Sequence, residues 1–80
     1  MDAAKIAELI EQGLPGATAR VASDDNTHFE AVVVSDAFEG KRSVARHQMV
    51  YAALGSTMGN EIHALSFRTF TPAEWQAQGA

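Results

Sequence analysis

Three histidines, His28, His47 and His63, are the residues of this sequence most able to do chemistry, and the chain has no cysteine. An imidazole binds a metal ion through one ring nitrogen while a hydrogen bond to the other nitrogen orients the ring. Without cysteine, the chain by itself can build neither a thiolate zinc site nor a thiolate iron–sulfur site. Any metal site must therefore use histidines and carboxylates, or ligands that a partner brings.

A second group of candidate residues is cationic. Lys41, Arg42 and Arg46 lie close together in the sequence, and Arg68 and Arg20 could add to them. Such a cluster suits phosphates or an acidic partner, but a solvated helix face looks the same. Cations in the first turns of a helix oppose its dipole, which favours a role other than stability. The formal net charge of −4 argues against a generally basic nucleic-acid binder.

The sequence offers no pattern for catalysis. We find no nucleophile paired with a base, no phosphate-binding loop and no supported pair of carboxylates. Asp24 and Asp25 belong to a run that is typical of a turn. The glycines at 55 and 59 lack the spacing of an RNA-clamping loop. We therefore expect a protein that is not an enzyme.

Length and composition predict a single small domain over residues 1–80. The chain is 46% hydrophobic and 20% charged, which is ordinary for a globular domain. No apolar run approaches the roughly 18 residues that a membrane helix needs. The acidic, amphipathic start does not resemble a targeting peptide. We expect a cytoplasmic protein that makes no membrane contact and is a monomer when isolated.

Three helices should position these residues. Apolar spacing predicts one helix over residues 2–13 and a longer one from about 41 to 59. A third helix should follow Thr71, which can form a capping box with Glu74, and its Trp75 should pack back on the sheet. The longer helix is predicted to turn one apolar stripe toward the core: Val44, His47, Tyr51, Leu54 and Met58.

Strands are predicted over residues 17–23, 28–35 and 61–70, the first only weakly patterned. With helices on one face, they make a two-layer α+β domain of order α-β-β-α-β-α. A helical crossover joins the last two strands, so these should be parallel in a mixed three-stranded sheet. His28 and His63 would then begin neighbouring strands at one sheet edge, where both could face one metal ion. Taken alone, each is more typical of a structural or surface histidine.

Several short motifs, taken together, resemble the BolA family. They lie between His28-Phe29 and the C-terminal end and include Phe38-Glu39-Gly40, Arg46-His47, Ile62-His63-Ala64-Leu65 and Thr71-Pro72-Ala73-Glu74-Trp75. Length and ending look most like the bacterial YrbA (IbaG) branch. The resemblance implies a class II KH-like fold. Two positions depart from the family pattern: Gln48 replaces a residue that is basic in some members, and the loop over 24–27 is short.

The resemblance also implies a partner and a cofactor. Members form complexes with monothiol (CGFS-type) glutaredoxins, often bridged by a [2Fe–2S] cluster that the isolated chain would not hold. It implies His63 as a cluster ligand and His28 as the candidate second ligand. His47 lies in the apolar stripe of the longer helix, so we expect it to be a packing residue. For some members the resemblance implies DNA binding and transcriptional regulation. Here that activity, or partner binding, would fall to the basic residues Lys41, Arg42, Arg46 and Arg68.

Overall fold

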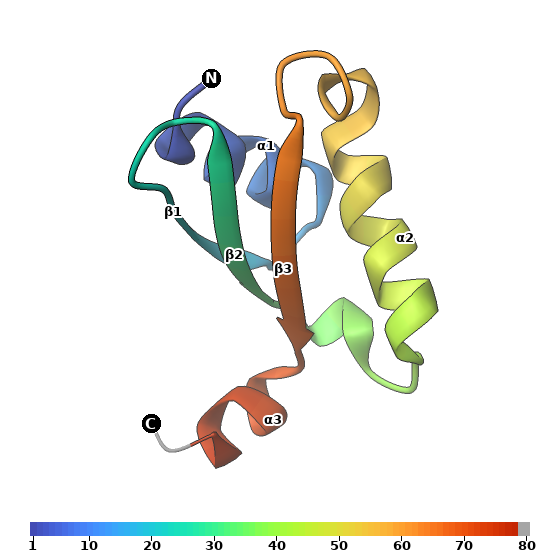
Figure 1. The fold of residues 1–80 in the computed structure, drawn as a ribbon. Coiled ribbons are helices and arrows are strands. Elements are labelled where there is room, and N and C mark those ends of the chain that lie inside the picture. The colour runs from blue at the N-terminus through green and yellow to red at the C-terminus, as the bar shows by residue number, and fades with distance from the viewer. Residues whose placement is uncertain (79–80) are drawn as a thin grey trace.

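The computed structural model describes residues 1–78 and has the predicted order α-β-β-α-β-α (Figure 1). The helices are α1 (Ala3–Gly13), α2 (Ser43–Leu54) and α3 (Pro72–Ala77). The strands are β1 (Thr18–Ala22), β2 (His28–Val34) and β3 (Ala64–Phe70). Two short 3-10 turns, η1 (Asp36–Phe38) and η2 (Gly55–Thr57), flank α2. Within residues 1–78, no helix is long and apolar enough to span a bilayer.

The three strands form one mixed sheet in the order β1-β2-β3. β1 and β2 are antiparallel, with Ala19 opposite Val33, as the short connection between them predicts. β2 and β3 are parallel, with Ala31 opposite Phe67, and α2 lies in the crossover between them (Figure 1). The predicted α+β class and mixed sheet are therefore confirmed.

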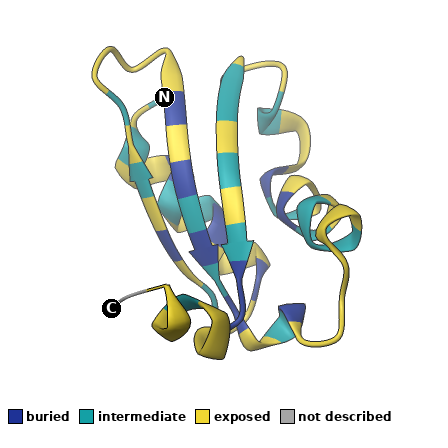
Figure 2. Cartoon of the chain, turned by 60° about the horizontal axis from the view of Figure 1, so that its bottom comes forward, coloured by how far each residue is buried: buried dark blue, intermediate teal, exposed yellow. Residues whose placement is uncertain are grey.

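The hydrophobic core lies between one face of the sheet and the two longer helices. Residues along β2 alternate between exposed and buried in the first half of the strand, as a half-covered sheet requires (Figure 2). From α1, Ile6 and Ile10 are fully buried against this face. The whole cluster comprises Ile6, Ile10, Leu14, Ala19, Phe29, Val33, Phe38, Val50, Leu54 and Ile62.

The apolar stripe predicted for the longer helix is only partly right: Leu54 is buried and His47 is half-buried, but the other two predicted residues within α2 are exposed. The buried residues of α2 are Val50 and Leu54, whereas Val44 is 70% exposed and Tyr51 is 45% exposed. Consecutive residues lie about 100° apart around a helix, so Val50, which was not in the predicted stripe, points about 100° away from Tyr51. α2 is also shorter than predicted, because it ends where Gly55 takes a φ of 56°.

The last helix begins with the predicted capping box. The Thr71 hydroxyl accepts the backbone N–H of Glu74 at 3.2 Å, and the Glu74 carboxylate accepts that of Thr71 at 2.9 Å. The Trp75 ring lies 5.2 Å from that of Phe70, so it packs back on the sheet as predicted. Together with Val32 and Val34 it lines a small hollow on the sheet face that α1 and α2 leave open.

Candidate functional site

His28 and His63 lie at the same end of the parallel strand pair. His28 is the first residue of β2 and sits opposite Ala64, the first residue of β3, so His63 is its near neighbour across the sheet edge. Both histidines are exposed and line one open hollow of about 650 Å³, together with Asp25 and Met58. The predicted placement of both histidines at one end of the parallel strand pair is confirmed. Their role as metal ligands stays a prediction.

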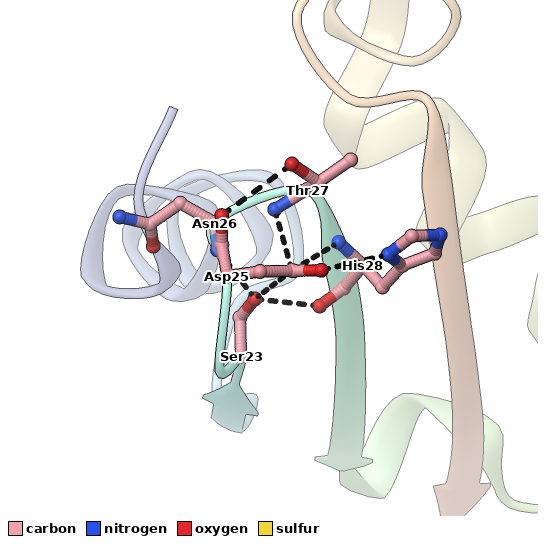
Figure 3. A network of polar contacts seen from close by, with 5 residues as sticks. All are labelled: Ser23, Asp25, Asn26, Thr27 and His28. Atoms are coloured by element: carbon pink, nitrogen blue, oxygen red, sulfur yellow. Dashed lines mark hydrogen bonds and ion pairs between the residues drawn. The ribbon is translucent and has the colours of Figure 1, made fainter.

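A tight turn between β1 and β2 holds His28 in place (Figure 3). One oxygen of Asp25 accepts the backbone N–H groups of Thr27 and His28, both at 2.9 Å. Its other oxygen lies 3.0 Å from Nδ1 of the His28 ring. The Ser23 hydroxyl donates to the His28 carbonyl at 2.6 Å, and Asn26 adopts a φ of 56° that suits asparagine in turns.

The Asp25 carboxyl has a pKa well below its usual range. The largest cause is the hydrogen bond from the His28 backbone N–H, followed by that with the His28 ring and then that from the Thr27 backbone N–H. Asp25 is therefore an anion whose acceptor sites are aimed at the start of β2. Sequence reasoning assigned it only to a turn. The sequence did carry a signal for this role: an aspartate three residues before a histidine that begins a strand.

His63 follows a segment that the core anchors. Ile62 is fully buried, and its carbonyl accepts the backbone N–H of Gly59 at 2.7 Å. The Thr57 carbonyl accepts the N–H groups of Glu61 and Ile62, each at 3.0 Å. These contacts fix the backbone just before His63, while the histidine itself stays exposed at the rim of the hollow.

The third histidine packs against β3. His47 is half-buried on α2, and its ring lies 4.6 Å from the ring of Phe67. The Phe67 ring also forms a T-shaped pair with the Tyr51 ring, with 5.4 Å between the ring centres. The expectation that His47 is a packing residue is therefore confirmed.

The predicted basic patch does not include Arg46. Its guanidinium forms two bonds with the Glu74 carboxylate, at 2.6 and 3.1 Å, and Nε donates to the Lys41 carbonyl at 2.8 Å. Only 13% of its side chain is exposed. The prediction that Arg46 belongs to an exposed binding patch is wrong, because this side chain links α2 to α3 through its ion pair with Glu74. Lys41 and Arg42 remain exposed at the start of α2.

Arg68 is also separated from Lys41 and Arg42. It stands on the open face of the sheet, where its guanidinium lies 5.6 Å from the centre of the Phe70 ring. Arg20 on β1 and Arg68 on β3 both lie opposite Val32 of β2, one on each side of it, and they line a second hollow of about 460 Å³. The predicted cluster is thus two patches: one at the start of α2 and one on the open sheet face.

Comparison with known families supports the sequence motifs. A family model described as BolA-like protein matches residues 8–74. The chain is 46% identical over 52 residues to the DNA-binding transcriptional regulator BolA of Haemophilus influenzae, a match that covers 65% of this chain and 50% of that protein. It is 46% identical over 50 residues to human BolA-like protein 1, covering 62% of this chain and 36% of that protein. The chain spans about half, or less, of the length of these curated relatives.

A solved structure matches over nearly the whole chain. The BolA homologue of Coxiella burnetii superposes with a TM-score of 0.86 at 45% identity and covers 95% of this chain and 97% of its own. The fold around the hollow is therefore shared with a protein of the same type. Membership of the YrbA (IbaG) branch stays a prediction.

Proposed function

Because the chain belongs to the BolA-like family, we propose that it is a non-enzymatic adaptor that binds a monothiol glutaredoxin and shares a [2Fe–2S] cluster with it. The observation that carries this proposal is the placement of His28 and His63 on one open hollow, at the end of a parallel strand pair. One imidazole begins β2 and the other immediately precedes β3, and two such exposed imidazoles suit a ligand that approaches from a second molecule. The proposal places the adaptor in the cytoplasm, where thiols stay reduced.

The donor set of this chain fits a shared cluster. Such a cluster takes four protein-side ligands, and two histidines can replace two cysteines on one iron. Within residues 1–78, no group of three or more histidines and carboxylates is gathered that could hold a metal ion alone. With no cysteine in the sequence, the thiolates have to come from the glutaredoxin and the glutathione that it binds. When bound with imidazole ligands, the cluster supplies an electron-accepting centre of raised potential.

The experiment that tests the proposal mixes the protein with a cluster-loaded monothiol glutaredoxin. We expect the visible absorption and circular dichroism of the cluster to change, because imidazole replaces sulfur at one iron. His63→Ala should abolish the change and His28→Ala should weaken it. Gln48→Ala, an exposed substitution on α2, is the control and should behave as the wild type. Unaltered spectral changes with both histidine variants would contradict the proposal.

DNA binding is the second candidate function. Its support is the similarity to the DNA-binding transcriptional regulator BolA of Haemophilus influenzae, together with the exposed pair Lys41 and Arg42 at the start of α2. An overall charge of −4 makes any such binding weak and strongly salt-dependent. Binding of duplex DNA at about 50 mM salt tests it.

A further inference from the structure

The His28 ring has two different surroundings at its two nitrogens. Nδ1 lies 3.0 Å from the Asp25 carboxylate. In Figure 3, the other nitrogen, Nε2, points away from Asp25 and toward the β3 side of the turn. The hollow that His28 lines includes His63 and Ala64 on the β3 side, and Ala64 lies opposite His28 in the strand register. The ring is therefore held in place through Nδ1, while Nε2 points away from Asp25.

The charge of Asp25 decides which nitrogen carries the proton. An ionised carboxylate can only accept a hydrogen bond, so a neutral imidazole beside it must donate from Nδ1. The same carboxylate also accepts the backbone N–H groups of Thr27 and His28, which leaves its second oxygen aimed at the ring. Nε2 of the neutral ring then has a free lone pair, which is what a metal ligand needs.

We propose that Asp25 is a positioning residue that holds His28 in the Nδ1–H tautomer and so keeps Nε2 free to bind iron in the hollow shared with His63. The side chain of His28 is 76% exposed, so surrounding packing does little to fix its ring. The Asp25 contact does that work in the manner of carboxylates that orient metal-binding histidines. The tautomer is a property of the isolated chain, whereas the iron it would bind rests on the proposed function.

Asp25→Asn separates the tautomer from the shape of the turn. The amide oxygen can still accept the backbone N–H groups, while its NH2 group replaces an acceptor with a donor beside Nδ1. We expect ring ¹⁵N NMR at a pH of about 8, above the usual histidine pKa, to show Nδ1–H in the wild type and Nε2–H in the variant. His47 and His63 are internal controls that should not change. His28→Gln assigns the signals.

Asp24→Asn is the matched control, since it makes the same charge change at an exposed neighbour in the same turn. It should leave the His28 tautomer unaltered. Backbone amide spectra of Asp25→Asn check that the turn survives. If they show that it does not, Asp25→Ala, which removes both donor and acceptor, should give His28 in mixed tautomers. A wild-type ring with Nε2–H, or the wild-type tautomer retained in Asp25→Asn or Asp25→Ala, would overturn the proposal.

Titration with cluster-loaded glutaredoxin gives the second readout. Asp25→Asn should weaken the complex by about 10- to 100-fold, as loss of an orienting carboxylate does in metal sites, and Asp24→Asn should not. Wild-type affinity in Asp25→Asn with a reversed tautomer would overturn the role in ligand positioning. If the wild type itself does not alter the cluster spectrum, the proposed function fails, while the NMR measurement still decides the tautomer.

Discussion

Two carboxylates, those of Asp25 and Glu74, each hold a basic side chain, and each has a lowered pKa. Asp25 orients an exposed histidine at the candidate site. Glu74 holds a guanidinium that is mostly covered, and so joins two helices. The bond from Arg46 and then the bond from the Thr71 N–H lower the pKa of Glu74 from 4.5 to about 2.

The Glu74 shift predicts acid sensitivity. A carboxyl whose pKa is lower in the folded state contributes stability above pH 4.5 that is lost as the pH falls toward 2. We expect the urea midpoint of the wild type to fall more steeply over this range than that of Glu74→Gln. Glutamine keeps the cap acceptor for Thr71 but cannot ionise. Since Asp25 titrates in both proteins, the difference isolates Glu74. Parallel pH curves would contradict the role of the ion pair.

At the scale of elements, the approach of α1 to α2 depends on one glycine. A Cβ added at Gly13 would lie 2.6 Å from the Cβ of Ala53 and 2.7 Å from its Cα. Both distances are far below van der Waals contact. Because one of the atoms belongs to the backbone, the clash cannot be relieved by turning a side chain. The two helices therefore pack closely only because position 13 has no side chain.

Gly13→Ala tests this packing, because two effects predict opposite signs. Helix propensity alone would make alanine about 1 kcal/mol more stable at a helical position. The contact with Ala53 should instead destabilise the protein by about 1–3 kcal/mol. Urea denaturation decides between them, with Gln12→Ala as an exposed control expected to change stability by less than about 0.5 kcal/mol. A stabilised Gly13→Ala protein would show that the helices do not approach this closely.

At the scale of the whole molecule, positive charge is divided among places with different surroundings. Lys41 and Arg42 are exposed at the start of α2, Arg46 is paired with Glu74, and Arg20 and Arg68 stand on the open sheet face. The formal net charge is −4. The DNA phosphates would therefore be attracted only by a local basic patch, while the protein's net negative charge repels them. The position of that patch can be tested.

Paired charge reversals locate a DNA-binding surface. The double variants K41E/R42E and R20E/R68E alter the net charge equally, so they differ only in the patch removed. At about 50 mM salt, we expect K41E/R42E to abolish duplex DNA binding by the wild type and R20E/R68E to retain more of it. Fluorescence anisotropy of a labelled duplex measures both. A wild type that does not bind, or equal loss in both variants, would exclude the α2 patch as a DNA site.

The features that could be predicted from the sequence were mostly those that depend on residues close to one another in the chain. The cap at Thr71 needs only Glu74, three residues away. The order of helices and strands follows from apolar periodicity within each segment. The meeting of His28 and His63 followed from topology, because a helical crossover makes β2 and β3 parallel and so brings their first residues to one edge.

The sequence by itself determined the element order, the sheet topology and the edge at which the two histidines meet. Only the tertiary structure decided which side of α2 is buried, that Arg46 is occupied by Glu74, and that Arg68 faces away from the α2 patch. The reason is that the partners of a side chain come from distant segments: Arg46 and Glu74 are 28 residues apart. The apolar periodicity of one helix does not tell which other element will pack against it. The buried side of α2 and the surroundings of these arginines were therefore decided by packing between elements.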